Sequence, residues 1–224
     1  MNAWLKKEFE ESGYEVECPI DGLLLVKNFI TQEEVKEYEK IIADATEEEW
    51  DKWYTDQLKI FTRAKFGRDD VENLVKEGLY EITTNWHDKN LSFVNAEIHR
   101  RVDARFDEIL KKSGSNLVLS GFYFIQRMYD GVELKSHHDQ NTDESIQHAA
   151  VIYINDDYND GEIFWAKKNF QIKPKSGEML IFQGNDEWEH GVRFVTKGPM
   201  RYVLPAFIKT PNFYNKDLGY QPKS

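Results

Sequence analysis

The chain has 224 residues, of which 40% are hydrophobic and 14% aromatic, so its composition is that of a folded globular protein and not of a disordered chain. The 40 acidic residues outnumber the 29 Lys and Arg residues and give a formal net charge of -11. This balance removes the broad basic surface that binding to a phosphate backbone needs. We therefore expect no nucleic-acid partner.

The sequence shows no targeting or membrane signal. Residues 1–10 carry charges throughout, without the apolar run of a secretory leader, and no later window approaches the ~20 apolar residues of a membrane span. We therefore expect a cytoplasmic protein with no membrane partner. Cys18 is the single cysteine, so any bound metal must be held by histidines and carboxylates.

The first half of the chain is predicted to be mainly helical, after a short apolar strand at residues 23–26. Thr31 and Glu34 form a capping box, in which Thr31 accepts a hydrogen bond from the third helical amide and Glu34 reaches back. Apolar residues follow at helical spacing up to Ile42. A helix is therefore expected to begin at Thr31.

Two further helices are expected in this half. A second capping signal at residues 46–49 precedes aromatic and apolar residues over 50–58. A longer helix is predicted over about residues 92–112, and Gly114 is placed to end it. The apolar stripe of the longer helix is Ile98, Val102, Phe106, Ile109 and Leu110.

After Gly114 the pattern changes to short β-rich runs separated by turn residues, which is typical of an antiparallel sandwich or barrel. The runs are roughly 117–128, 148–155, 161–165, 169–173, 178–183 and 201–208. The helical half is expected to pack on the β half. We predict one domain over 1–224, with a lead-in strand and supporting helices at 1–114, a core at 115–209 and a C-terminal tail at 210–224.

A cluster of potential metal ligands stands in the β half. His137, His138 and Asp139 are consecutive, and His190 follows much later. Two histidines and one carboxylate, with two ligands close in sequence and one distant, match the facial triad of non-haem iron(II) oxygenases, which leaves coordination positions open. Side chains on an extended segment alternate between faces, so His137 and Asp139 would share a face and His138 would point away. Taken alone, the His-His-Asp sequence also fits an ordinary polar loop.

Further motifs follow in a fixed order. They are the strand 149–155 with Tyr153 and Asn155, then Gly161, Pro174-Lys175-Ser176-Gly177 before an apolar strand, His190-Gly191, and Arg201 on the last strand. In this order the chain resembles the prolyl 4-hydroxylase-like branch of the iron(II)/2-oxoglutarate dioxygenases, over about residues 117–208. The resemblance implies an α+β, mainly β fold: a double-stranded β-helix, or cupin-like jelly roll, over residues 115–209 with N-terminal supporting helices.

The resemblance also implies an enzyme. It would use iron(II), held by His137, Asp139 and His190 as the catalytic centre, with 2-oxoglutarate and dioxygen as co-substrates and ascorbate as a candidate reductant. It would hydroxylate a carbon of a peptide or small molecule while 2-oxoglutarate is decarboxylated to succinate. Because Asp139 is present, hydroxylation is favoured over halogenation, since related halogenases lack this carboxylate.

Three residues would serve the co-substrate. Arg201 is a basic residue in an otherwise apolar strand, and a buried charge is costly unless it is paired. The resemblance implies that Arg201 binds the distal carboxylate of 2-oxoglutarate, which a guanidinium can do through two parallel hydrogen bonds. A strand-end salt bridge is the alternative. Tyr153 matches a tyrosine whose hydroxyl assists, or is an ordinary core aromatic, and Tyr129 lies in a segment that borders the co-substrate in relatives.

The chain departs from the family pattern at several positions. Collagen-type prolyl hydroxylases have a lysine ten residues after the distal histidine, whereas here Met200 is tenth and Arg201 eleventh. Asp160 replaces one glycine of the usual pair, and Phe194 stands where a proline is common. These departures leave the primary substrate open between a peptidyl proline, a free amino acid and another small metabolite.

Single residues bear on three other possible functions. Nucleic-acid demethylases with the same cofactors typically carry a second arginine six residues after the first, and Phe207 stands there. A non-catalytic cupin-like module that binds a metal or a sugar is possible on the same fold. A zinc hydrolase would need a general base, for which Glu133 or Glu189 is only a nominal candidate.

The remaining aromatic and imidazole side chains are interpreted more simply. Trp188 lies two positions before His190 and either packs in the core or lines the substrate entrance. His87, His99 and His148 lack metal-ligand spacing to a suitable partner and are interpreted as structural.

Overall fold

The computed structural model describes residues 3–50, 89–92, 96–122, 124–141 and 143–211. The helix expected over 50–58 lies outside the described residues except for Trp50, and His87 and most of the expected C-terminal tail lie outside them as well.

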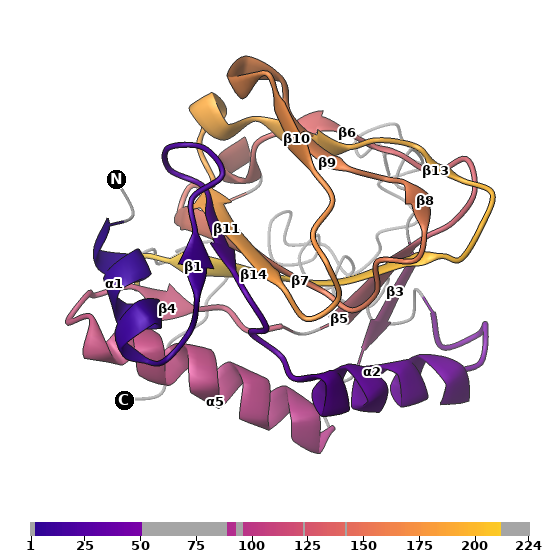
Figure 1. Cartoon of the computed structure of the whole chain (residues 1–224), viewed down its shortest axis with the longest axis horizontal. Helices are drawn as coiled ribbons and strands as arrows, with labels where there is room; N and C mark the ends of the chain where they lie inside the picture. The colour runs from indigo at the N-terminus through magenta and orange to yellow at the C-terminus, as the bar shows by residue number, and fades with distance from the viewer. Residues whose placement is uncertain (1–2, 51–88, 93–95, 123, 142, 212–224) are drawn as a thin grey trace, which may run out of the picture.

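Two antiparallel sheets face each other and enclose the interior of the molecule (Figure 1). The larger, eight-stranded sheet contains, in spatial order, β1 (Val16–Glu17), β2 (Leu24–Val26), β11 (Met179–Gln183), β7 (Ile146–Tyr153), β14 (Arg201–Lys209), β5 (Phe124–Met128) and β3 (Lys89–Ser92), with β4 (Val118–Leu119) also paired to β14. The smaller sheet contains β10 (Phe170–Ile172), β9 (Ile163–Trp165), β12 (His190–Val192) and β6 (Leu134–His137). A separate pair joins β8 (Asn159–Asp160) to β13 (Val195–Thr196). This is the jelly roll.

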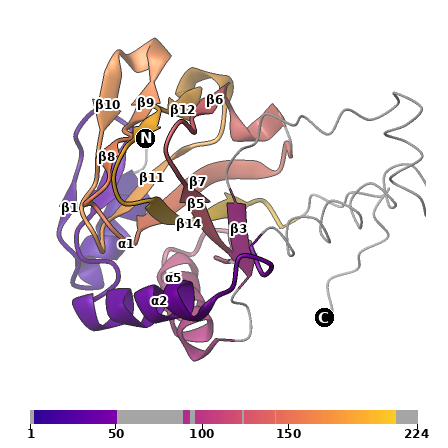
Figure 2. The same cartoon turned by 90° about the vertical axis from the view of Figure 1, so that its right-hand side faces the viewer.

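Helices cover the outer face of the larger sheet. They are α1 (Ala3–Glu11), α2 (Gln32–Asp44) and α5 (Glu97–Lys112), and Figures 1 and 2 place α2 and α5 on the side opposite the smaller sheet. The predicted apolar stripe of α5 is buried, and it belongs to one core cluster with residues of α1, β5, β7 and β14. None of the described helices is long and apolar enough to cross a membrane.

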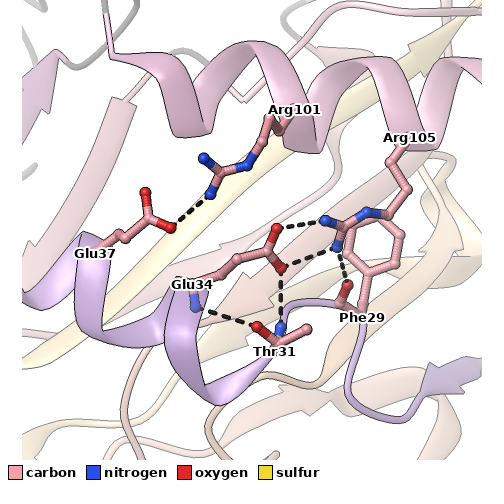
Figure 3. A network of polar contacts seen from close by, with 6 residues as sticks. All are labelled: Phe29, Thr31, Glu34, Glu37, Arg101 and Arg105. Atoms are coloured by element: carbon pink, nitrogen blue, oxygen red, sulfur yellow. Dashed lines mark hydrogen bonds and ion pairs between the residues drawn. The ribbon is translucent and has the colours of Figure 1, made fainter.

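A polar network fixes the start of α2 to α5 (Figure 3). The Glu34 amide donates to Thr31 Oγ1 at 3.2 Å, and the Thr31 amide donates to Glu34 Oε2 at 2.9 Å, so the predicted capping box is confirmed. The guanidinium of Arg105 also donates to both oxygens of Glu34 and to the Phe29 carbonyl. Burial works against the charged form of Glu34, but the hydrogen bonds from Arg105 and the Thr31 amide lower the pKa of its carboxyl. One carboxylate therefore caps α2 and ties it to α5.

The boundaries of several elements differ from the sequence-based expectation. Residues 89–92 form β3, so the long helix begins at Glu97 instead of Ser92, although Gly114 follows its end as predicted, with φ +65°. The run at 117–128 divides into β4 and β5, because Gly121 takes a φ of +89° between them and the Phe122 amide turns to donate to Asp103 of α5. Helix α1 was not predicted.

Candidate metal and co-substrate site

Two histidines meet where β6 and β12 pair. His137 ends β6, His190 begins β12, and the two are partners in the register of the smaller sheet. Their ring centroids are 4.5 Å apart. Asp139 is the first residue of a short 3-10 helix that follows β6. The structure thus brings His137, Asp139 and His190 together, with potential ligand atoms within 4.8 Å of one another.

Each histidine presents its Nε2 atom to this group. The Nδ1 atom of His137 lies 2.8 Å from the carbonyl oxygen of Lys135, and the Nδ1 atom of His190 lies 3.1 Å from the carbonyl oxygen of Trp188. A carbonyl oxygen only accepts, so each Nδ1 carries the hydrogen and each Nε2 keeps its lone pair. A hydrogen bond of this kind to the distal ring nitrogen orients metal-bound histidines in proteins.

Burial sets the charge states of the site. It raises the pKa of Asp139 to about 7 and lowers the pKa of His190 to about 3, the nearby ring of His137 adding to the second effect. A charged carboxylate at this place is therefore costly unless a cation lies beside it, whereas His190 is held neutral. The neutral imidazole of His190, the imidazole of His137 and one carboxylate that needs a cation fit an open iron(II) site.

Strand alternation is not what places Asp139. The strand β6 ends at His137, and the chain then turns, with the Gln140 amide donating to the Gly184 carbonyl at 3.0 Å and the Asn141 amide donating to the His138 carbonyl. The expectation of an extended segment through residue 139 was therefore wrong in its geometry. His138 is nevertheless not a member of the ligand group, as expected.

A cavity of about 140 Å³ lies between the two sheets next to these ligands. Its described lining is mostly apolar, and apart from the three ligands and Arg201, Gln126 is the one side chain with hydrogen-bonding groups among the described residues that line it. The lining residues are Phe124, Gln126, Leu134, His137, Asp139, Ala149, Val151, Ile163, Phe182, His190, Val192, Arg201, Val203, Pro205, Ala206 and Phe207. The lining includes Arg201 as well as the three ligands.

Arg201 is a buried cation, 1% exposed, at the start of β14. It donates to the Tyr153 hydroxyl at 3.3 Å and contacts Met128 Sδ at 3.4 Å, and its Nε has no hydrogen-bond partner. Within the part of the chain that the structure describes, no carboxylate forms an ion pair with it. The guanidinium carbon also lies 6.0 Å from the ring centroid of Tyr158. A buried guanidinium that contacts two tyrosines and a thioether is suited to an anionic ligand.

The two tyrosines expected at the co-substrate lie outside the cavity lining. Tyr153 is fully buried on β7, with its hydroxyl accepting from Arg201 and its ring centroid 5.2 Å from the guanidinium carbon. Burial raises the pKa of Tyr153, which keeps the phenol neutral. Its observed contact is with Arg201. Tyr129 is half-buried and packs against a small apolar cluster with Met128 and Val192.

Trp188 and His99 have structural contacts. Trp188 is 1% exposed and packs on Trp165 and Phe182, and an added Cβ at Gly22 would lie 2.6 Å from its ring. His99 Nδ1 lies 3.0 Å from a backbone carbonyl oxygen. The packing interpretation of Trp188 and the structural interpretation of His99 therefore hold.

The structure shows the backbone conformation or the exposure of each residue that departs from the family pattern. Asp160 has a φ of +53°, the left-handed region that glycine adopts without cost, and Gly161 beside it has a φ of +68°. Phe194 is 52% exposed, and Met200 is exposed while the next residue, Arg201, points inward. The residue eleven positions after His190 is therefore the inward-facing one.

Sequence reasoning missed most of the cavity wall, including Phe124 and Gln126 on β5. The alternation of side chains along paired strands could have identified these two residues. Val203 of β14 pairs with Gln126, and alternate residues of both strands share a face, so the inward position of Arg201 implies inward positions for Val203, Gln126 and Phe124. Phe207, which replaces the second arginine of demethylases, also lies on this face.

The comparisons with known proteins agree with this site. Residues 123–209 match the family model of the 2OG-Fe(II) oxygenase superfamily. The chain is 39% identical over 69 residues to prolyl 3-hydroxylase 2 of Homo sapiens and 32% identical over 56 residues to prolyl 3-hydroxylase 3 of Mus musculus. These alignments cover 29% and 23% of this chain but only 10% and 8% of the two relatives, so the chain spans about a tenth of their length.

Solved structures share the fold over most of their length. The viral collagen prolyl hydroxylase of Paramecium Bursaria Chlorella virus-1 aligns over 86% of this chain and 98% of its own, with a TM-score of 0.57 and 15% identity. A Pseudomonas putida prolyl-4-hydroxylase aligns over 93% and 100%, with a TM-score of 0.56 and 14% identity. A Trichoplax adhaerens prolyl hydroxylase, solved with a hypoxia inducible factor peptide fragment, aligns over 100% and 98%, with a TM-score of 0.59 and 14% identity. This chain therefore shares the jelly-roll fold of these structures, and its residues 123–209 are similar to the 2OG-Fe(II) oxygenase superfamily.

Proposed function

We propose that this chain is an iron(II)- and 2-oxoglutarate-dependent hydroxylase. The observation that carries the proposal is Arg201, a buried cation without a carboxylate partner among the described residues, which lines the same cavity as His137, Asp139 and His190. A group that binds the triad at one end and Arg201 at the other must carry metal-binding oxygens and a distant anion. 2-Oxoglutarate has both.

The side chains of the site would have separate roles. The Nε2 atoms of His137 and His190 and the carboxylate of Asp139 would hold the metal on one side and leave the cavity side for co-substrate. When bound, iron(II) supplies the activation of dioxygen, in which 2-oxoglutarate becomes succinate and carbon dioxide and one oxygen atom enters a substrate C–H bond. Arg201 would fix the distal carboxylate, and the apolar walls would exclude water.

A prolyl residue of a peptide is the substrate class that we propose. The solved structures compared here are prolyl hydroxylases, and one of them was solved with a peptide fragment. The mostly apolar cavity wall suits an aliphatic ring. A sugar-binding cupin-like module is less well supported, because a neutral sugar would leave the buried charge of Arg201 without an anion.

The test is co-substrate turnover. Purified protein with iron(II), 2-oxoglutarate, ascorbate and air should produce succinate, and proline-containing peptides should increase the rate and gain the mass of one oxygen atom. His190→Ala should abolish turnover, whereas His99→Ala, which changes a histidine outside the cavity lining, should leave it unchanged. If no peptide or small molecule supports succinate formation above a metal-free blank, the proposed function is wrong.

A further inference from the structure

The cavity has a wall that the metal and the co-substrate leave unused. Among the described lining residues, the only charged or metal-binding side chains are those of the triad and Arg201. Phe124, Pro205 and Phe207 form an apolar part of the remaining wall, and Gln126 is the polar member beside them. Together, these four residues form the β5–β14 wall.

Strand pairing separates this wall from the carboxylate anchor. Arg201 pairs with Met128, whereas Gln126 pairs with Val203, the next inward residue along β14. Phe124 lies a further two residues along β5 and shares the face of Gln126. The wall therefore extends along the two strands from Gln126 away from the Arg201 end.

The triad lies over the same end of the larger sheet as Phe207. His190 packs edge-on against Phe182 with centroids 4.6 Å apart, Phe182 pairs with Ala149, and Ala149 pairs with Phe207. Phe207 is thus two strands away from Phe182, the residue that contacts the ring of His190. A substrate carbon that lies against Phe207 would be close to the metal without displacing the group held by Arg201.

The chemistry of the wall selects what can bind there. Arg201 would be occupied by the co-substrate, so the described lining offers no second cation for the carboxylate of a free amino acid. A neutral carboxamide such as that of Gln126 both donates and accepts hydrogen bonds, which matches a peptide group. Burying an ionised group here without a partner would cost more than burying an amide.

We infer that Gln126 is a specificity-determining residue, which hydrogen-bonds an uncharged amide of the primary substrate while the adjoining apolar side chain packs on Phe124, Pro205 and Phe207. This inference rests on the proposed function. It goes further, because it assigns the substrate side of the cavity and selects residues within a chain over free amino acids.

The experiment compares Gln126→Met with Gln171→Met, which makes the same change at an exposed glutamine of β10 outside the cavity. Binding is measured calorimetrically on protein loaded with Mn(II) and 2-oxoglutarate, with N-acetyl amino-acid amides and the matching free amino acids as probes. Wild type should prefer capped compounds. Gln126→Met should bind them about three- to tenfold more weakly, the range expected for one neutral hydrogen bond, and Gln171→Met should match wild type.

Two control measurements separate this inference from the proposed function. The 2-oxoglutarate affinity of Gln126→Met should stay within twofold of wild type, and Gln171→Met should keep the wild-type rate of slow succinate release without primary substrate. A wild-type preference for free amino acids, unchanged capped-compound binding in Gln126→Met, or a matching loss of 2-oxoglutarate affinity would overturn the inference. Failure of the wild-type protein to bind 2-oxoglutarate would instead contradict the proposed function.

Discussion

Replacing Arg201 with methionine tests the central feature of the site, because the stability of the protein and its response to 2-oxoglutarate should change in different ways. Without ligand, the arginine donates to the Tyr153 hydroxyl at 3.3 Å and contacts Met128 Sδ at 3.4 Å, and its guanidinium carbon lies 5.2 and 6.0 Å from the ring centroids of Tyr153 and Tyr158. Removing it leaves the Tyr153 hydroxyl without this donor, at a cost of about 1 kcal/mol, and relieves a buried charge. The free energy of unfolding without ligand should therefore change by no more than about 1 kcal/mol. A structural buried ion pair would cost roughly 3 to 5 kcal/mol when broken.

The effect of the ligand should be much larger. Losing the charge-assisted contacts to a carboxylate costs about 3 kcal/mol, or roughly a 100-fold loss of affinity. At a 2-oxoglutarate concentration 100 times the wild-type Kd, wild type should gain about 2.7 kcal/mol of stability. The variant, whose Kd would then equal the ligand concentration, should gain only about 0.4 kcal/mol.

The assay is urea unfolding of Mn(II)-loaded protein with and without 2-oxoglutarate. All curves are analysed with one common m value, the slope of the unfolding free energy against urea concentration. Arg193→Met, which changes an exposed arginine outside the cavity lining, is the matched control and should keep the full response to the ligand. A loss of several kcal/mol without ligand would mean that Arg201 is a structural ion-pair partner. A full ligand response in Arg201→Met would place the carboxylate anchor elsewhere.

Three further outcomes are expected. His137→Ala should lose iron(II) by metal analysis and His138→Ala should keep it; the opposite result would contradict the ligand set. In the metal-free protein the pKa of Asp139 is raised to about 7, so its contribution to stability is present below about pH 4 and is lost as the pH rises through 7. The pKa of His190 is lowered to about 3, so its contribution is present above about pH 6.5 and is lost as the pH falls toward 3. Asp139→Asn removes the first of these contributions. As the pH falls from about 6 to about 4, the free energy of unfolding of the metal-free variant should therefore fall by about 1.4 kcal/mol per pH unit relative to wild type, as measured by urea unfolding; parallel pH profiles would refute this. Gly22→Ala should lower the melting temperature, because its φ is +91° and its Cβ would strike a buried indole, and an unchanged melting temperature would contradict that packing.

Features encoded by local chemistry could be predicted from the sequence. The Thr31–Glu34 capping box and the helix end before Gly114 depend on residues within one turn of each other. The order of motifs also led to the jelly roll and to the ligand set that the structure brings together. These inferences needed no knowledge of distant contacts.

Features that depend on distant contacts could not be predicted in the same way. The break between β4 and β5 occurs because the Phe122 amide finds an acceptor on α5, which the strand-like composition of that run does not reveal. The place of Gln126 follows only from its pairing with β14, 75 or more residues later. Asp139 was assigned to the correct group by alternation, yet a turn that is anchored at Gly184 sets its direction.

The carbonyl contacts of the two histidine ligands have a consequence for how such a site can change over time. Each imidazole donates its orienting hydrogen bond to the backbone carbonyl two residues earlier, at Lys135 and Trp188, and every amino acid has that carbonyl. The side chains at these two positions are therefore released from the task of selecting a tautomer. One is exposed to solvent and the other is buried in the core, so substitutions there can alter the surface or the packing while the metal-facing nitrogen is inherited unchanged.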